Sequence, residues 1–135
     1  MKKLKVRIFK AGNSFSASLP EVDGFCMSDR SIDGLKHRIR ESLEFHLEGL
    51  YPEERCGWMD EPYEFEYIME DIASVLGNFE GILNQSSLAR VSGINESLMR
   101  QYALGIKTPS ARTMAKVRNG LINLAKRLES VNIAL

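Results

Sequence analysis

The chain has 135 residues, and its 18 lysine and arginine residues are balanced by 18 aspartate and glutamate residues, so its formal net charge at pH 7 is zero. No apolar run approaches the roughly 18 residues that a membrane-spanning helix needs, and the basic start at Met1 is not followed by a signal-peptide pattern. We therefore expect a soluble, cytoplasmic protein that does not contact a membrane. The cysteines, Cys26 and Cys56, belong to no CxxC motif or histidine cluster, so neither a metal site nor a disulfide is expected.

The first part of the chain has the two-residue period of β-strands. Apolar and polar residues alternate over 4–9 and again over 15–19, with a turn at 11–13 between them. Residues 25–27 form a short third strand in this prediction, after a turn at 23–24. The pattern indicates an antiparallel meander with one face on a core.

A long amphipathic helix is expected next. Ser31 is a candidate N-cap, Gly49 lies near the end, and apolar residues recur at intervals of three or four. That helix should cover one face of the sheet, because a one-sided sheet and a striped helix each need an apolar partner. After a loop over 52–62, the alternation at 63–67 predicts a fourth strand of the same, wholly antiparallel sheet. The first domain is therefore expected to span residues 1–68.

Residues 83–109 are typical of a helix-turn-helix. One short helix is expected over 85–92, and Gly93 can adopt the positive φ that stops it. Asn95 can cap a second helix that runs to about Leu104, and Gly105 ends it. The spacing of Ala89 and Gly93 suggests that the two helices cross closely at both positions. A helical hairpin in an unrelated all-α core is the alternative.

Such a motif would present polar side chains to duplex DNA. Arginine can pair with guanine and glutamine with adenine, while residues at the start of the first helix suit a phosphate oxygen. The candidate DNA-binding residues are Gln85, Ser86, Asn95, Glu96, Ser97, Arg100, Gln101 and Lys107. Each of them, taken alone, also fits an ordinary solvated surface.

Charge is unevenly distributed along the chain. Residues 1–60 carry ten bases and ten acids, residues 61–80 carry six acids and no base, and residues 81–135 carry eight bases and two acids. A basic C-terminal part is typical of a protein that binds a polyanion, and the moderate excess suggests that tight binding needs a dimer.

The motif is flanked by further predicted helices. One is expected over 69–77, packing under the motif, and a longer one over 110–129, for which Ser110 is a candidate N-cap. Residues 130–135 alternate again and are predicted to form a terminal strand that pairs with a second chain or returns to a sheet, the alternative being a frayed tail. The second domain is therefore expected to span residues 69–135 and to bind DNA and dimerise.

The chain resembles the HicB antitoxins of bacterial HicA and HicB toxin-antitoxin pairs. The likeness rests on residues 15–25 and 43–50 in the first half and on 92–103 and 105–109 in the second half. It implies an α+β protein with a truncated ribonuclease H-like N-terminal domain and a lambda-repressor-like helix-turn-helix. The N-terminal domain would cover a HicA-type toxin, a small ribonuclease, and the C-terminal domain would bind the operator of its own operon. Family members form homodimers and also tetramers.

Enzymatic activity and a cofactor are not expected. A metal-dependent ribonuclease H site typically begins with an acid on the first strand, whereas the polar positions here are Lys3, Lys5 and Arg7. A toxin that cleaves RNA should be basic, so acids are the candidate toxin-binding residues, although ordinary solvated charge or an exposed strand edge would serve as alternatives. These acids are Glu53, Glu54, Asp60, Glu61, Glu64 and Glu66.

Two other functions are compatible with the same chain. A ligand-responsive helix-turn-helix repressor without a toxin partner would need a polar pocket in the N-terminal domain. An RNA-processing enzyme is disfavoured by the missing acids on the first strand.

Overall fold

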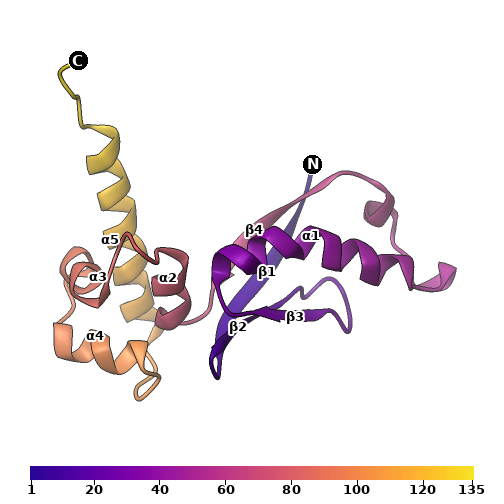
Figure 1. Cartoon of the computed structure of the whole chain (residues 1–135), viewed down its shortest axis with the longest axis horizontal. Coiled ribbons are helices and arrows are strands. Elements are labelled where there is room, and N and C mark those ends of the chain that lie inside the picture. Colours follow the sequence, from indigo (N-terminus) through magenta and orange to yellow (C-terminus); the bar gives the residue numbers. More distant parts are fainter. The chain divides into compact units, whose positions relative to one another are not determined.

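The computed structural model describes all 135 residues and divides them into two compact units, Met1–Asn78 and Phe79–Leu135 (Figure 1). The expected boundary lay after Ile68, so the structure divides the chain later than the sequence suggests. No helix in either unit is both long enough and apolar enough to cross a bilayer.

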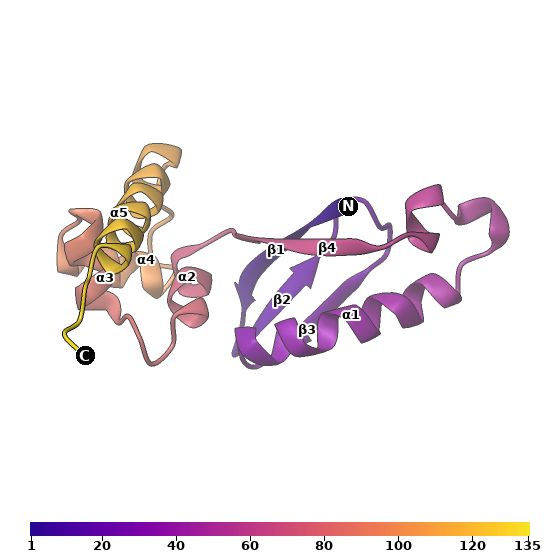
Figure 2. The ribbon, with the colours of Figure 1, turned by 90° about the horizontal axis from the view of Figure 1, so that it is seen from above.

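The first unit contains a mixed four-stranded sheet. Its strands are β1 (Lys2–Ala11), β2 (Ser14–Ser18), β3 (Cys26–Asp29) and β4 (Tyr63–Met69), in the order β3-β2-β1-β4 (Figure 2). The predicted antiparallel meander of β1, β2 and β3 is confirmed. The prediction of a wholly antiparallel sheet is wrong, because β4 pairs with β1 in parallel. A parallel neighbour requires a crossover connection, which the helix between β3 and β4 provides.

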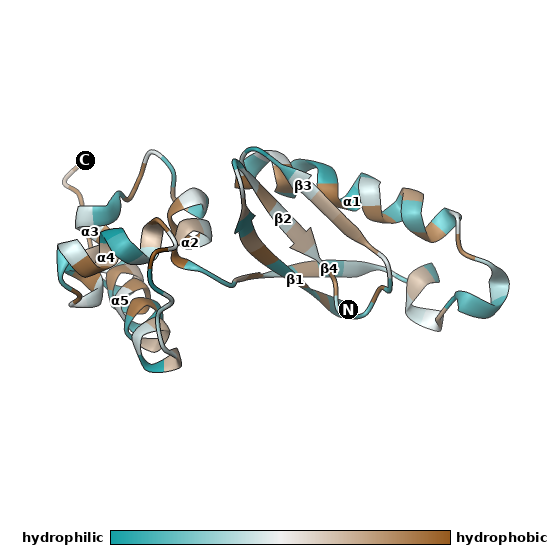
Figure 3. Ribbon diagram, turned by 90° about the horizontal axis from the view of Figure 1, so that it is seen from below, coloured by the Kyte–Doolittle hydropathy of each residue, from teal (hydrophilic) through white to brown (hydrophobic).

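That helix, α1 (Ile32–Glu48), begins and ends where the sequence predicts. The Ser31 side chain accepts a hydrogen bond from the Gly34 amide at 3.0 Å, and Gly49 is the C-cap. Hydrophilic and hydrophobic residues alternate along the helix (Figure 3). Five of the apolar residues are buried against the inner face of the sheet, namely Ile32, Leu35, Ile39, Leu43 and Leu47, whereas Phe45 is exposed. The alternation on β1 places Leu4, Val6 and Ile8 in the same core.

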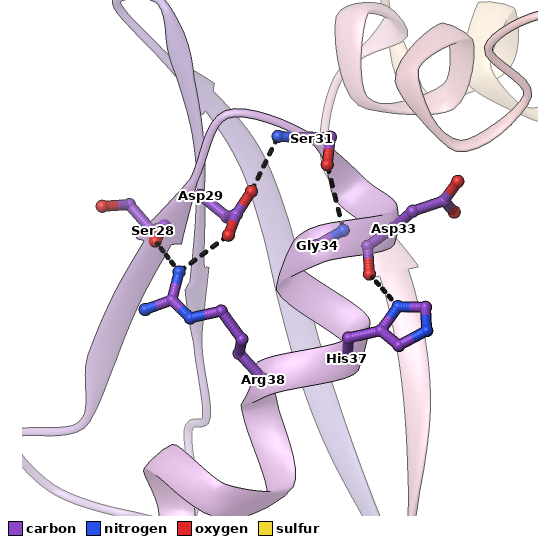
Figure 4. A network of polar contacts seen from close by, with 7 residues as sticks. All are labelled: Ser28, Asp29, Ser31, Asp33, Gly34, His37 and Arg38. Carbon is purple, nitrogen blue, oxygen red and sulfur yellow. Dashed lines mark hydrogen bonds and ion pairs between the residues drawn. The ribbon is translucent and has the colours of Figure 1, made fainter.

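A polar network fixes the start of α1 (Figure 4). The Asp29 carboxylate accepts hydrogen bonds from the Ser31 amide at 3.0 Å and from the Arg38 guanidinium at 2.7 Å. These bonds, the one from Ser31 being the strongest influence, hold the pKa of Asp29 below its ordinary value. Gly34 leaves the room that this carboxylate needs, because an added Cβ would lie 2.5 Å from its Oδ1.

The short helix α2 (Ile72–Asn78) packs within the first unit. Asp71 accepts hydrogen bonds from the backbone amides of Ser74 and Lys10, which joins the start of α2 to β1. An added Cβ at Gly77 would lie 2.6 Å from the Phe15 ring. The predicted helix is confirmed over Ile72–Asn78. The sequence analysis expected it to pack under the helix-turn-helix, whereas these contacts place it against β1 and β2 of the sheet.

The second unit consists of α3 (Gln85–Ser92), α4 (Glu96–Ala103) and α5 (Ala111–Glu129). Its core contains one or two fully buried residues from each helix, namely Leu88, Ala89, Met99 and Val117. All three helices begin at a side-chain cap: Asn84, Asn95 and Ser110 accept hydrogen bonds from the amides of Ser87, Ser97 and Thr113. The predicted caps at Asn95 and Ser110 are confirmed, whereas the cap at Asn84 was not predicted.

Two glycines in this unit differ in what they do. Gly93 has φ of +68° and ends α3, as predicted, but an added Cβ would meet nothing within 4 Å. The prediction of a close helix crossing at Gly93 is therefore wrong. The close approach lies at Gly120 of α5, where an added Cβ would stand 2.3 Å from the Val91 carbonyl oxygen.

The last residues, 131–135, form no strand. Val131, Ile133 and Leu135 are exposed, as are Ile122 and Leu128 near the end of α5. The expectation that these residues return to a sheet of the same chain is therefore wrong, whereas pairing with a second chain stays a prediction. The end of α5 and the tail thus form an uncovered apolar segment.

Candidate functional site

The first turns of α4 hold three of the predicted DNA-binding side chains on the surface. Glu96, Ser97 and Arg100 are all exposed. Arg100 follows Glu96 by four residues and Ser97 by three, so it neighbours both of them on the surface of the helix. Neither Glu96 nor Arg100 uses its side chain in a hydrogen bond or an ion pair. Both groups are free to meet a ligand.

Asn95 has a structural task at this site. Its Oδ1 accepts hydrogen bonds from the amides of Ser97 at 2.8 Å and Leu98 at 3.3 Å, which closes the open start of α4. With these amides satisfied, the side chains of Glu96 and Arg100 are not needed as caps.

Gln101 does not fit the outward set. It is half-buried, and its Oε1 is enclosed with no hydrogen-bond partner. The expectation that Gln101 faces outward beside Arg100 is therefore wrong. Gln101 is one residue after Arg100, so the turn of the helix carries its side chain away from Arg100. It lies instead on the side of Leu98 and Tyr102, which are also half-buried.

The remaining candidates lie at helix ends. Gln85 and Ser86 are exposed in the first turn of α3, where the neighbouring pair Asn84 and Ser87 performs the capping reciprocally. Lys107 is exposed just after Gly105, and its amide donates to the Gln101 carbonyl at 3.3 Å. The side-chain amide of Gln85, the hydroxyl of Ser86 and the ammonium group of Lys107 can each donate a hydrogen bond to a phosphate oxygen.

The second unit has an uncompensated positive charge. Residues 79–135 carry eight bases and three acids. All five ion pairs of the chain lie in the first unit, so none of these eight bases is neutralised by a carboxylate. Free cations on a small helical unit favour a polyanionic ligand.

The acids predicted to bind a toxin are all exposed, but half of them are already engaged. Asp60 pairs with Arg55 at 2.8 Å, Glu64 with Lys3 at 3.9 Å, and the Glu54 carboxylate accepts a hydrogen bond from the Tyr51 amide. Glu53, Glu61 and Glu66 have no such partner. An engaged carboxylate is a weaker candidate, since a partner protein would have to replace its existing contact.

A hollow of about 380 Å³ brings two of these acids together with acids from α1. Asp60 and Glu61 line it on one side, and Glu44 and Glu48 line it from the helix. Sequence reasoning missed the two helical acids, although their spacing of four on the polar face of α1 was a usable signal.

Tyr63 lies in the wall of the same hollow. Its hydroxyl is enclosed and has no hydrogen-bond partner. Burial raises the pKa of this phenol, Glu44 raises it further, and Arg40 opposes both. The Arg40 guanidinium also lies 5.0 Å from the ring centroids of Tyr63 and Phe65, which holds it against β4.

No helix of the first unit covers the second face of the sheet. Lys3, Lys5, Arg7 and Phe9 point to it from β1, and Glu64 and Glu66 stand beside the first two on β4. A positive row on β1 therefore lies beside a negative row on β4, and Lys3 and Arg7 are paired with Glu64 and Glu70. No group of three or more histidine, cysteine, aspartate or glutamate side chains is placed to hold a metal ion.

Comparison of the chain with protein-family models, with curated proteins and with solved structures identified no match.

Proposed function

We propose that the chain is a HicB-type antitoxin, which neutralises a HicA-type toxin through its N-terminal unit and represses its own operon through its C-terminal unit. The observation that carries this proposal is the arrangement of α3 and α4. A glycine with positive φ, an asparagine cap and an exposed, unpaired Arg100 follow one another as in a helix-turn-helix.

The DNA-binding part of the proposal rests on α4 as the recognition helix. Arg100, Glu96 and Ser97 would meet base edges, while Gln85, Ser86 and Lys107 would contact the phosphate backbone. The free positive charge of the second unit supports this assignment, because phosphate neutralisation supplies most of the non-specific affinity for DNA.

A homodimer would complete the DNA-binding unit. The exposed fractions of Ile122, Leu128 and Ile133 are 46%, 66% and 71%, so apolar surface continues from α5 into the tail. A second copy of the chain would cover this segment and set two recognition helices on two half-sites. Sedimentation of the Leu128→Glu variant tests this part: we expect monomers, and an unchanged dimer would contradict it.

The toxin-binding part rests on the free acids of the first unit. Glu53, Glu61 and Glu66 are exposed without a partner and would attract a basic ribonuclease. We also propose that the first unit has a truncated ribonuclease H-like fold and that it catalyses no reaction.

Co-expression with the neighbouring small reading frame tests the two-partner function. We expect the neighbour to arrest growth alone and to form a stable complex with this chain that abolishes the arrest. Replacing Glu61 and Glu66 by lysine should weaken that complex, whereas replacing Glu80 and Glu129 by lysine, a matched double change at exposed acids of the other unit, should not. Growth arrest that persists despite full expression of this chain would refute the antitoxin role.

A further inference from the structure

Glu96 occupies an unusual position in the second unit. It is the one acid between Gly81 and Leu128, and it stands in the first turn of α4 on an otherwise basic unit. Its side chain is exposed and has no ion pair. A carboxylate at this place repels phosphate, so it opposes DNA binding unless it meets a hydrogen-bond donor on the DNA.

Capping does not account for Glu96. The Asn95 side chain already accepts hydrogen bonds from the amides of Ser97 and Leu98. A carboxylate in the first turn of a helix gains little from the helix dipole at an exposed site. Stabilisation of α4 is therefore a small effect beside the repulsion that a DNA-facing acid would introduce.

Arg100 follows Glu96 by four residues, which is the spacing at which glutamate and arginine usually attract each other on a helix. No bond joins them here, so both charged groups remain available on the same face. Gln101 does not belong to this exposed set, because its Oε1 is enclosed by the protein. The exposed polar groups left at the centre of the face are those of Glu96, Ser97 and Arg100.

We infer that Glu96 and Arg100 read a cytosine and a guanine in each half-site of the operator; this inference rests on the DNA-binding function proposed above. A carboxylate accepts a hydrogen bond from cytosine N4, and a guanidinium donates two to guanine O6 and N7. Four residues of helix span about 6 Å, so the two bases lie about one or two base pairs apart.

Selection of bound sequences from a pool of randomised duplexes tests the inference with the full-length chain. The parent should select half-sites that contain the cytosine and the guanine at this separation. Glu96→Gln should shift the preference at the first position from cytosine to adenine by about tenfold, because glutamine pairs with adenine. Arg100→Ala should lose the guanine preference and keep the cytosine preference. Glu80→Gln, an exposed acid of the same unit outside α4, should select the parental sequences.

Three results would overturn the inference and leave the proposed DNA-binding function intact. If Glu96→Gln selects the parental sequences and binds every duplex more tightly, Glu96 only repels phosphate. If Glu96→Gln changes the unfolding midpoint but neither sequence preference nor affinity, Glu96 only stabilises α4. If the parent binds duplexes in a salt-sensitive manner without selecting a sequence, the base assignment fails while DNA binding stands. A parent that binds no duplex would refute the proposed DNA-binding function itself.

Discussion

An added Cβ at Gly120 would stand 2.3 Å from the carbonyl oxygen of Val91. Gly120 thus lets α5 approach the end of α3 closely. The nearest atom belongs to the backbone of Val91 and not to a flexible side chain. The position of α5 in the second unit depends on this close approach. We expect Gly120→Ala to lower the free energy of unfolding by about 1–3 kcal/mol, even though alanine is the better helix former.

Chemical denaturation of Gly120→Ala beside Asn119→Ala provides the check. Asn119 is exposed on the same helix, so its replacement should be neutral or slightly stabilising. Equal stability of the two variants would mean that α5 does not approach α3 this closely.

Gly93 should respond to a side chain for a different reason. Its φ is +68° and the space around it is open, so the cost of substitution is conformational, about 1–2 kcal/mol for an L-residue with a side chain. Gly93→Ala and Gly93→Leu should lose similar stability, and Gly93→Asn should lose less. A much larger loss for leucine than for alanine, measured by thermal unfolding, would restore the close crossing that the sequence suggested.

Arg100 and Lys107 should affect DNA binding in distinct ways. Arg100→Ala should weaken binding and relax the preference for one base, by about 1–3 kcal/mol at that position. Lys107→Ala should weaken binding to all sequences alike and reduce the salt dependence by about one counterion, because it would contact phosphate. Fluorescence anisotropy over a range of salt concentrations separates the two. Gln101→Ala serves as a control, and a loss of base preference there would contradict its inward placement.

Asp29 should make the first unit sensitive to acid. Its pKa in the folded chain lies below the ordinary 3.8, so its contribution to stability is present above that value and is lost as the pH falls through the lower, folded pKa. Asp29→Asn should therefore be less stable than the parent near neutral pH, and the difference should shrink at about pH 2.5. Denaturation at both pH values checks this, and a difference independent of pH would assign the effect to geometry alone.

Local signals in the sequence were sufficient for most elements. Alternation identified β1 and β2, and side-chain caps at Ser31, Asn95 and Ser110 marked three helix starts. These features depend on neighbouring residues, so a single sequence contains them. The parallel pairing of β4 with β1 is a long-range relationship, and the alternation at 63–67 is the same for either direction.

The misplaced site residues have a similar cause. Helical spacing alone puts Gln101 beside Arg100, but the depth at which α4 sits in its unit decides that Oε1 is enclosed. Likewise Gly120 resembles any helical glycine until the path of α3 is known. The terminal alternation over 130–135 shows an apolar surface without showing what covers it.

The most direct test of the central claim, that α4 delivers Arg100 to duplex DNA, is binding of the full-length chain to the promoter region of its own operon. Anisotropy should show saturable binding to that duplex, weaker binding to a shuffled duplex of equal composition, and a steep decline with salt. Equal binding of the parent and Arg100→Ala to the promoter duplex, or no binding of the parent to either duplex, would contradict the claim.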